Sequence, residues 1–381
     1  MNIFTDYMIN RILKPVIEGK LSGGKAIILL GPRQTGKTTL LSAIAELRGD
    51  YLVMNCDDPF IRELLENAGE ANLKQIIGKY TTVFIDEAQR VKNIGLTLKI
   101  ITDQIKEVQL IVSGSSALEL ANEINEPLTG RKWEYLLFPI SWQELQSHIG
   151  YLKAMQQLEQ RLVYGMYPEV INNTGNETEI LKQLADSYLY KDLLSFKGIR
   201  KPEIIQKLLK ALALQIGNEV SYNELANTLQ IDKNTVSTYI DLLEKAFVIF
   251  RLQPFSRNLR NEISTNRKIY FYDTGIRNIL INNLNAIGFR NDLGALWENF
   301  LIAERMKFIH YNAVYSNTYF WRTSQKQEID YIEERGGKLY VYEFKWKPGK
   351  FRKFPETFTR AYPGSEFLSI YHTNFNEFLG V

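Results

Sequence analysis

A short segment near the amino terminus carries the residue types that bind the phosphates of a nucleotide. GPRQTGKT, residues 31–38, fits the pattern G-x-x-x-x-G-K-[S/T], between the strand-like run KAIILL at 25–30 and a helical pattern. Its glycines let the backbone fold so that N–H groups point at phosphates. Lys37 would then reach the β- and γ-phosphates, and the Thr38 hydroxyl would ligate Mg²⁺. The flanking strand and helix disfavour the alternative, a chance glycine-rich turn.

Two acidic residues follow another apolar run, TTVFIDEAQ at 81–89. Asp86 ends this run, where its carboxylate can hold the Mg²⁺ shell through water or through Thr38. Glu87 is then placed to polarise the attacking water as a general base. An acidic pair at a strand end is common by itself, but after such a glycine-rich loop it indicates a hydrolytic site.

Three further residues are candidates for contact with phosphate. Ser113 ends the run QLIVSG and would sense the γ-phosphate, although a local serine–backbone turn explains it equally well. Arg131 would stabilise phosphate from the same chain or from a neighbouring subunit, or it is a solvated surface arginine. Arg33 touches phosphate or braces the loop. The predicted nucleotide-binding set is Gly31, Pro32, Arg33, Gln34, Thr35, Gly36, Lys37, Thr38, Thr39, Asp86, Ser113 and Arg131, with Thr38 and Asp86 as metal ligands.

A second constellation lies near the carboxyl end, in EIDYIEERGGKLYVYEFKW at 328–346. The two glycines at 336 and 337 are typical of a two-residue hairpin turn, and the register that this turn sets places Asp330 opposite Glu343. Opposed carboxylates repel each other unless a divalent cation lies between them. Lys345 shares the face of Glu343, where it would activate water or steady a scissile phosphate.

The same register offers a simpler explanation of these residues. Glu328 falls opposite Lys345 and could pair with it, while Asp330 and Glu343 could be solvated on an exposed face. The following segment, KWKPGKFRKF at 345–354, interleaves basic and aromatic residues. It is typical of a loop that follows a phosphate backbone, or of a solvated basic loop.

Three helical patterns in the middle of the chain, between residues 203 and 247, indicate a helix-turn-helix. Ser221 and Glu224 form a capping box at the start of the second helix, and VIFRLQPFSRN at 248–258 can form a wing. Such a unit places its last helix in a DNA groove. The residues expected to face outward there are Lys233, Asn234, Ser237 and Thr238. Basic residues are few on that helix, so an interdomain or protein contact is an equal alternative.

These sites require two sheets to position them. The apolar runs at 25–30, 51–56, 81–86, 109–114 and 135–140 alternate with helical patterns and predict a parallel α/β sheet buried on both faces. Later runs at 268–273, 318–322, 328–334 and 338–346 predict a second group of strands. We therefore expect three domains, at residues 1–150, 151–260 and 261–381.

The composition is that of a globular protein, with 381 residues, 45% hydrophobic and 23% charged. A net charge of +3 by itself implies no polyanionic partner. The single cysteine, Cys56, excludes an intramolecular disulfide, fits a reducing compartment and indicates packing rather than chemistry. The first residues lack the pattern of a signal peptide, and no apolar run reaches about 18 residues. We expect a cytoplasmic protein without a membrane span.

A family resemblance extends over nearly the whole chain. GPRQTGKTTLL, YLVMNCDDP, FIDEAQR, LIVSGSS and LTGR occur in the order and spacing of a prokaryotic family of AAA-like ATPases with a C-terminal domain of unknown function. This resemblance implies that the nucleotide is ATP. The hairpin at 328–346 resembles that of PD-(D/E)xK nucleases, in which the acidic pair binds Mg²⁺ and the lysine assists hydrolysis. It implies Glu298 as a further metal ligand beside Asp330 and Glu343; Ile329 departs mildly from the pattern.

The predicted fold class is α/β: an ASCE-type P-loop parallel sheet with helices on both faces, a helical winged-helix unit and a restriction-endonuclease-like α/β domain. The predicted function is Mg²⁺-dependent ATP binding and hydrolysis coupled to action on nucleic acid, with Glu87 and Lys345 as catalytic residues. The alternatives are a signalling ATPase that controls protein partners through a catalytically inactive nuclease-like module, and a protein remodeller. The expected partners are ATP and DNA or another nucleic acid, and Arg131 suggests a homo-oligomer.

Overall fold

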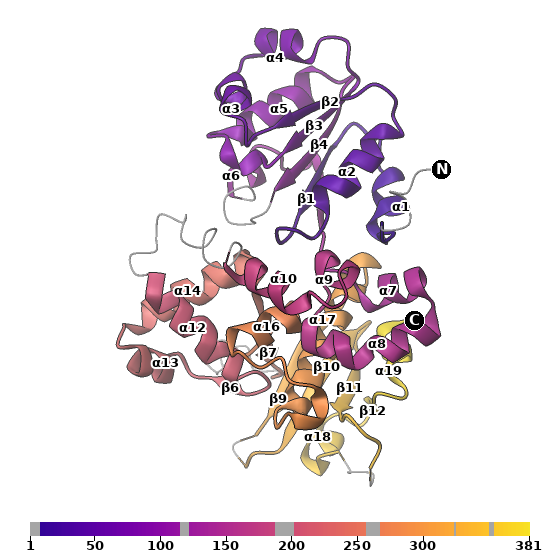
Figure 1. The fold of residues 1–381 in the computed structure, drawn as a ribbon, viewed down its shortest axis with the longest axis vertical. Helices are drawn as coiled ribbons and strands as arrows, with labels where there is room; N and C mark the ends of the chain where they lie inside the picture. Colours follow the sequence, from indigo (N-terminus) through magenta and orange to yellow (C-terminus); the bar gives the residue numbers. More distant parts are fainter. Residues whose placement is uncertain (1–7, 115–121, 187–201, 257–266, 324, 350–353) are drawn as a thin grey trace. The chain divides into compact units, whose positions relative to one another are not determined.

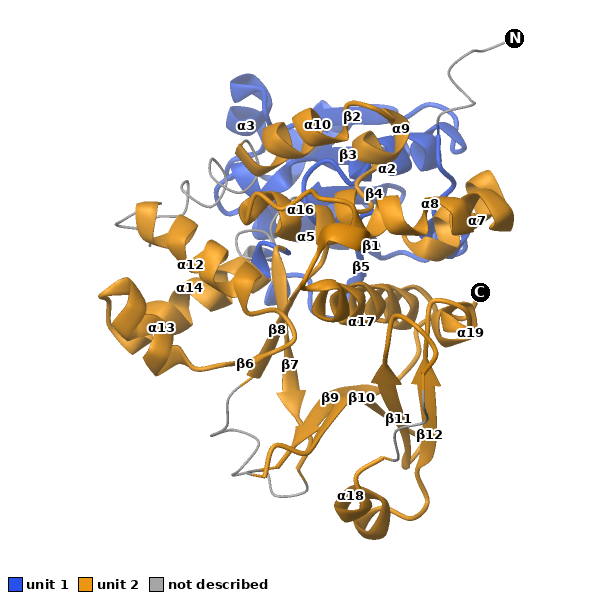
Figure 2. Ribbon diagram, turned by 60° about the horizontal axis from the view of Figure 1, so that its bottom comes forward, with its two compact units in different colours: residues 1–140, 245–247 blue, residues 141–244, 248–381 orange. Residues whose placement is uncertain are grey.

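The computed structural model describes residues 8–114, 122–186, 202–256, 267–323, 325–349 and 354–381. The chain forms two compact units, residues 1–140 with 245–247 and residues 141–244 with 248–381, which Figure 2 colours separately. Within the described residues, no helix is both long enough and apolar enough to cross a membrane. The division into three domains stays a prediction.

The first unit contains a five-stranded parallel sheet in the order β2-β3-β4-β1-β5 (Figure 1). Its strands are β1 (Ala26–Leu30), β2 (Leu52–Asn55), β3 (Thr82–Asp86), β4 (Gln109–Gly114) and β5 (Lys132–Leu136). The flanking helices are α1 (Leu13–Glu18), α2 (Lys37–Glu46), α3 (Pro59–Leu65), α4 (Glu70–Ile77), η2 (Ala88–Arg90), α5 (Ile94–Gln104) and α6 (Asn122–Asn125). The predicted parallel P-loop sheet flanked by helices is confirmed.

Burial explains why the sequence forms this sheet. Every residue of β1, β3 and β4 is buried, as expected for central strands covered on both faces. The last strand ends earlier than predicted, at Leu136 instead of residue 140. Pro139 follows it, and proline has no N–H to continue a ladder. Because the strands are parallel, the residues after β1, β3 and β4 lie at one edge of the sheet.

The second unit contains a seven-stranded mixed sheet in the order β12-β11-β10-β9-β7-β8-β6. Its strands are β6 (Glu219–Val220), β7 (Ile249–Pro254), β8 (Arg267–Phe271), β9 (Asn317–Arg322), β10 (Glu328–Arg335), β11 (Lys338–Phe344) and β12 (Glu366–Ile370). Its helices are α7 (Trp142–Ile149), α8 (Tyr151–Tyr164), α9 (Pro168–Asn172), α10 (Glu177–Leu184), α12 (Pro202–Leu214), α13 (Tyr222–Leu229), α14 (Lys233–Lys245), α16 (Thr274–Leu280), η5 (Ile287–Phe289), α17 (Leu293–Tyr311), α18 (Glu356–Ala361) and α19 (Phe375–Leu379).

The three helices of the predicted helix-turn-helix are present as α12, α13 and α14. Ser221 caps α13 by accepting a hydrogen bond from the backbone N–H of Glu224, at 3.4 Å. The segment predicted as a wing forms β7, which pairs with β8 on one side and with β9 on the other. The end of that segment, from residue 257 onward, lies outside the described residues.

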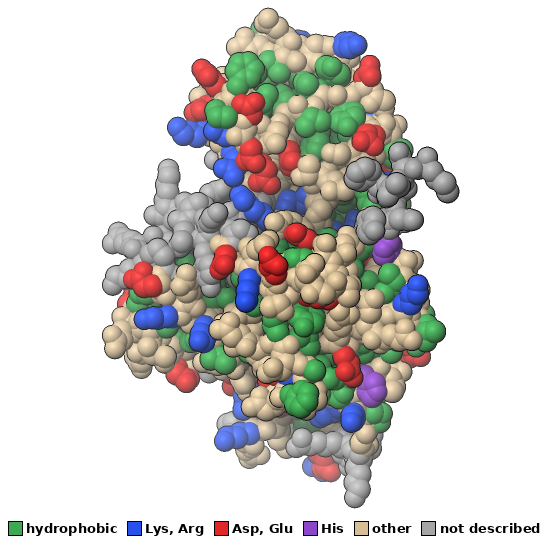
Figure 3. Space-filling model, viewed as in Figure 1, with side chains coloured by type: hydrophobic (Ala, Val, Ile, Leu, Met, Phe, Trp, Pro, Cys, Tyr) green, Lys and Arg blue, Asp and Glu red, His purple; other side chains and the backbone are tan. Residues whose placement is uncertain are grey.

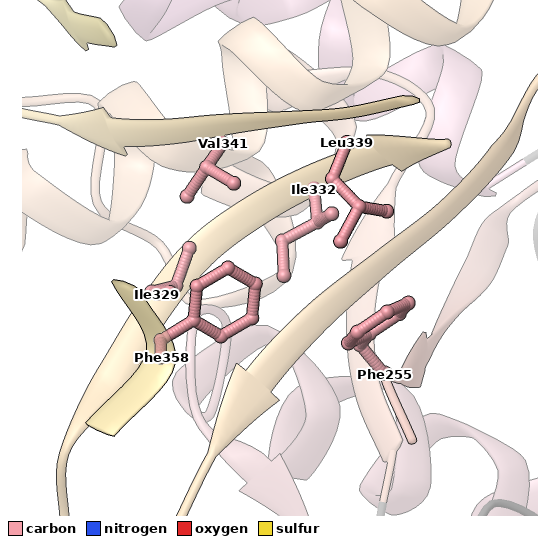
Figure 4. Close-up of a cluster of buried hydrophobic side chains, with 6 residues drawn as sticks. All are labelled: Phe255, Ile329, Ile332, Leu339, Val341 and Phe358. Atoms are coloured by element: carbon pink, nitrogen blue, oxygen red, sulfur yellow. The ribbon is translucent and has the colours of Figure 1, made fainter. Parts of the chain in front are cut away.

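The carboxyl-terminal hairpin has the predicted register where its strands pair. Arg335 lies opposite Lys338, and Tyr331 lies opposite Tyr342. The pairing of β10 with β9 shifts between Ile329 and Ile332, so a β-bulge lets these two residues face the same hydrophobic cluster although they are three positions apart. Figure 4 shows this cluster, formed by Phe255, Ile329, Ile332, Leu339, Val341 and Phe358. It anchors the hairpin on which the second constellation lies.

The close approach at Gly31 gives a first prediction. Gly31 has φ 148°, and a Cβ there would lie 2.1 Å from the carbonyl oxygen of Leu137, which is backbone and cannot rotate away. Gly24 also has a positive φ, 69°, but its Cβ would meet open space. We expect Gly24→Ala to lower the free energy of unfolding by about 1–2 kcal/mol, and Gly31→Ala to lower it by about 1–3 kcal/mol more.

Denaturant unfolding of the two variants checks this expectation. Equal losses would show that the junction between the loop and the end of β5 is less tight than the structure indicates.

Candidate functional site

The P-loop connects β1 to α2 at the carboxyl edge of the sheet. Gly31, Gln34 and Gly36 have φ of 148°, 59° and 89°, so three of its residues have positive φ. The ammonium of Lys37 folds over the loop and donates to the carbonyl oxygens of Gly31, at 2.9 Å, and Pro32, at 2.7 Å. Lys37 is only 5% exposed. Its charge is therefore held close to the loop, while its predicted contact with the β- and γ-phosphates stays a prediction.

Helix α2 begins immediately after the loop, with Gly36 as its N-cap. The N–H group of Leu40 donates to the carbonyl of Gly36, at 2.9 Å. The N–H groups before Leu40 therefore have no partner within the helix, and they point along its axis with the positive end of its dipole. An anion such as phosphate is stabilised at such a terminus.

The carboxylate of Asp86, at the end of β3, is bonded to the start of α2 and to the end of β4. Its Oδ2 accepts a hydrogen bond from the Thr38 hydroxyl at 2.8 Å, and its Oδ1 accepts from the Ser113 hydroxyl. Asp86 is 6% exposed and Ser113 is fully buried. The described contact of Ser113 is thus with Asp86; the alternative, a local turn toward Ser116, falls on residues outside those described, and the role of Ser113 as a phosphate sensor stays a prediction.

Glu87 follows Asp86 in a left-handed backbone conformation, with φ 52°. Its N–H donates to Asp86 Oδ1 at 3.1 Å, and its own Oε2 accepts from the Gln89 amide at 2.6 Å. Gln89 contributes a hydrogen bond to this site, and the sequence did not identify it. Its position two residues after the candidate base was the available signal, but only the turn η2 shows that the amide folds back onto Glu87.

Cys56 lies beside this site but has no reactive character. Its N–H donates to the carbonyl of Asp86 at 3.0 Å. Burial, reinforced by the charge of Asp86, raises the pKa of the Cys56 thiol to about 12. A thiol with such a pKa stays protonated near neutral pH, consistent with a packing role.

Arg131 does not lie at the P-loop of its own chain. It precedes β5, whose first residue pairs with Ala26 at the amino end of β1, whereas the P-loop follows the carboxyl end of β1. At about 3.3 Å per residue the five-residue strand separates them by roughly 16 Å. Arg131 Nε binds Asp103 Oδ1 at 2.6 Å, at the edge of a cavity of about 530 Å³. A role in a neighbouring subunit stays a prediction, and Arg33 lies half-buried within the loop.

The second constellation contains two lysines, each between two carboxylates. Lys345 Nζ lies 2.7 Å from Glu343 Oε1 and 3.8 Å from Asp330 Oδ2. Lys268 Nζ, fully buried, lies 2.9 Å from Glu298 Oε1 and 2.6 Å from Glu328 Oε1.

Lys268 was missed in the sequence because it begins the strand-like run KIYFYD, and nothing in that run indicated the partners of its side chain. Glu328, which the simpler explanation paired with Lys345, instead binds Lys268.

Burial dominates the electrostatics of this cluster. It raises the pKa of Glu298 to about 7, with a contribution from Asp330, even though Lys268 acts in the opposite direction. Burial also raises the pKa of Asp330, against the charges of Lys268 and Lys345. Burial disfavours the charged form of Lys268, but its carboxylate neighbours, Glu298 first, outweigh that cost and raise its pKa. The two lysines thus offset charge that would otherwise be costly to bury.

The predicted three-carboxylate metal site is not assembled in this arrangement. Within the described residues, no group of three or more His, Cys, Asp or Glu side chains is placed to hold a metal ion. Glu298 accepts hydrogen bonds from Lys268 and from the Tyr270 hydroxyl, while the backbone N–H of Phe344 donates to Asp330 Oδ2 at 2.8 Å. The residues present therefore do not fit a divalent cation there.

A cavity of about 540 Å³ adjoins the cluster. Its lining residues are Gln325, Lys326, Gln327, Glu328, Asp330, Glu343, Lys345, Phe354 and Pro355. Part of the basic segment predicted to follow phosphates, residues 350–353, lies outside the described residues.

The sheet order, the P-loop and Asp86 together define the fold of a P-loop nucleoside triphosphatase in the first unit. Residues 23–146 match the family model described as AAA domain, which supports a P-loop ATPase family and ATP binding and hydrolysis. Residues 155–286 and 293–379 match two domains of unknown function, DUF8612 and DUF4143.

Similar proteins occur in bacteria and archaea. Uncharacterized protein Rv2008c of Mycobacterium tuberculosis is 27% identical over 324 residues, 84% of this chain and 70% of that protein. Uncharacterized protein MJ1544 of Methanocaldococcus jannaschii is 25% identical over 346 residues, 84% of this chain and 75% of that protein. Among solved structures, the Walker-type ATPase paby2304 of Pyrococcus abyssi is 16% identical with a TM-score of 0.49, covering 72% of this chain and 96% of that chain.

The internal ion pairs of Lys268 give a second prediction. We expect nucleotide-free protein carrying Asp86→Asn, which weakens the P-loop metal site, to bind no Mn²⁺ in the second unit. Adding Lys268→Met releases two carboxylates and should create a site for about one Mn²⁺, measured by electron paramagnetic resonance. Lys307→Met is the matched control, because Lys307 is also buried and pairs with Glu304 at 2.5 Å, neither of which lines the cavity.

Circular dichroism would verify that these variants are folded. If the protein with native Lys268 already binds Mn²⁺ and Glu298→Gln abolishes that binding, the conclusion that the residues do not fit a metal is wrong.

Proposed function

We propose that the first unit binds Mg²⁺-ATP at the P-loop and hydrolyses it, with Glu87 as the general base. The observation that carries this proposal is the position of the Asp86 carboxylate. It accepts hydrogen bonds both from Thr38 of the P-loop and from Ser113 near the end of β4. The loop, the candidate metal-binding carboxylate and the adjacent candidate base therefore lie at one edge of one sheet.

The side chains at this edge suit a triphosphate with its metal. The N-terminus of α2 and the N–H groups of the loop would hold the phosphate oxygens. Thr38 and Asp86 are hard oxygen ligands 2.8 Å apart, which fits Mg²⁺ held by Thr38 directly and by Asp86 through water. When bound, Mg²⁺ supplies charge neutralisation between the phosphates. Lys37 would exchange its two carbonyl partners for phosphate oxygens, which accept its charge-assisted hydrogen bonds better.

Glu87 has the support that a general base needs. The Gln89 amide donates to one carboxylate oxygen, while the Glu87 N–H is held by Asp86. These contacts fix the backbone and the side chain near the candidate Mg²⁺ ligands without burying Glu87 completely, since the residue is half-buried. A partly solvated carboxylate can accept the proton of water as that water attacks phosphorus.

Coupling of ATP hydrolysis to nucleic acid is the finer part of the proposal. It rests on the helices α12, α13 and α14, with β6, β7 and β8 beside them, as a winged-helix unit. Lys233, Asn234 and Thr238 are exposed on α14, as a recognition helix requires. Arg251, in contrast, forms ion pairs with Asp241 and Glu244, so its charge is already engaged within the protein. Figure 3 shows acidic and basic side chains interspersed over this region of the visible face.

A second candidate function is favoured by the ion pairs of Lys268 and Lys345. If the nuclease-like cluster needs no metal, the second unit is a catalytically silent module. The ATPase would then act as a nucleotide-dependent switch on protein partners. The two candidates share the ATPase and differ in what they expect of DNA.

The general-base assignment gives a third prediction. We expect Glu87→Gln to reduce ATP turnover about 100-fold or more, since the amide cannot accept the proton, while ATP affinity changes little. Phosphate release and calorimetric ATP binding measure the two effects. Glu46→Gln, at the far end of α2, is the matched control and should keep turnover. Turnover that persists in Glu87→Gln would refute the assignment.

The proposed coupling to nucleic acid gives a fourth prediction. Duplex DNA should bind with an affinity that falls steeply with salt, because phosphate contacts release counterions. Lys233→Ala should weaken binding and lower the salt slope by roughly 1, measured by fluorescence anisotropy. The control Lys210→Ala removes an exposed lysine of α12, outside the turn between α13 and α14. Absence of salt-dependent binding to DNA by the full chain would favour the second candidate.

A further inference from the structure

Arg11, just before α1, contacts the P-loop near its end. Its Nη1 donates to the carbonyl oxygen of Thr35 at 2.6 Å, and its Nη2 donates to the carbonyl oxygen of Phe138 at 2.6 Å. The residue is 8% exposed. Its guanidinium therefore connects the nucleotide loop with the segment that leaves β5, two parts of the chain about 100 residues apart.

The same two segments touch at a second place. The backbone of Gly31 packs so closely on Leu137 that a Cβ would lie 2.1 Å from the Leu137 carbonyl oxygen. The N–H of Leu137 donates to the carbonyl of Leu30 at 2.8 Å. The start of the loop is thus fixed by backbone contacts, whereas the end of the loop, at Thr35, is tied to the same segment through Arg11.

The contact at Thr35 determines where the next amide points. In a planar trans peptide the C=O of Thr35 and the N–H of Gly36 point in opposite directions. Because Arg11 holds the Thr35 oxygen, the Gly36 N–H points away from the Arg11 guanidinium. Gly36, with φ 89° and no side chain, would otherwise let this peptide rotate at little cost.

We propose that Arg11 is a positioning residue for ATP binding. It fixes the peptide between Thr35 and Gly36 so that the N–H, and not the C=O, faces the phosphates. It also links the loop to Phe138, shortly before the chain enters the second unit at Ser141. This inference rests on the proposed ATPase function.

The chemistry requires arginine at this position. A planar guanidinium offers parallel donors in a fixed geometry and stays charged even when buried, so it can hold two carbonyl groups at once. A lysine has one nitrogen on a flexible stem and cannot hold both in the same geometry. A carbonyl rotated toward the phosphates would place a partial negative charge against them.

The test separates this role from general stability. Arg11→Ala, Arg11→Lys and Ile17→Ala are compared; Ile17 is fully buried in α1, so its truncation destabilises the same segment without touching the loop. We expect Arg11→Ala to weaken ATP binding at least ten-fold, with Arg11→Lys intermediate and Ile17→Ala near wild type, all measured by calorimetry below the melting temperatures. Guanidinium ions at millimolar concentration should restore affinity to Arg11→Ala alone.

Each outcome decides one question. If wild type does not bind ATP, the proposed function fails and this inference fails with it. If wild type binds ATP but Arg11→Ala loses no more affinity than Ile17→Ala, or guanidinium does not restore it, only the positioning role is refuted.

Discussion

The buried carboxylate of Asp86 is the constraint on which the first unit depends. A charged group that is 6% exposed is costly unless its oxygens are paired. Asp86 is paired by the hydroxyls of Thr38 and Ser113 and by the N–H of Glu87. These partners come from the P-loop, from β4 and from the end of β3 itself, so the ends of three segments must converge. The strand order, with β4 between β1 and β3, makes that convergence possible.

The second unit also buries carboxylates, but there the partners are charged ammonium groups instead of neutral donors. Hydroxyl and amide groups pair Asp86 without cancelling its charge, so a cation that arrives with phosphate gains from it. In the other cluster, ammonium groups of Lys268 and Lys345 already neutralise their neighbours, among them Glu298 and Asp330. A divalent ion would have to displace those ammonium groups. Under the proposed function, similar residue types therefore suit one site to a metal–nucleotide complex, whereas in the other the carboxylates are already paired by ammonium groups.

The sequence predicted what is local and missed what connects distant segments. The parallel sheet, the P-loop conformation and the hairpin register follow from consecutive residues, because a glycine pattern or a two-residue turn determines its own geometry. Lys268 and its partner Glu298 lie 30 residues apart, and Arg11 lies 127 residues from Phe138, so no local pattern reveals either pair. The bulge in β10 and the early end of β5 depend on neighbouring strands and on Pro139, which periodicity alone did not weigh.

Two cationic side chains, Lys37 and Arg11, contact the P-loop and differ in how they can respond to a nucleotide. That difference bears on how a change at the loop is transmitted to other parts of the chain. Lys37 holds the carbonyls of Gly31 and Pro32 with a flexible side chain, so it can exchange them for phosphate. Arg11 holds its two carbonyls with a buried planar fork, and exchanging them would leave buried acceptors unpaired. The loop can therefore respond to a nucleotide at one cation while the other preserves its shape. Arg11 also binds the carbonyl of Phe138. Any backbone shift that ATP imposes on the end of the loop must therefore either strain the two hydrogen bonds of the Arg11 guanidinium or move the chain that follows β5.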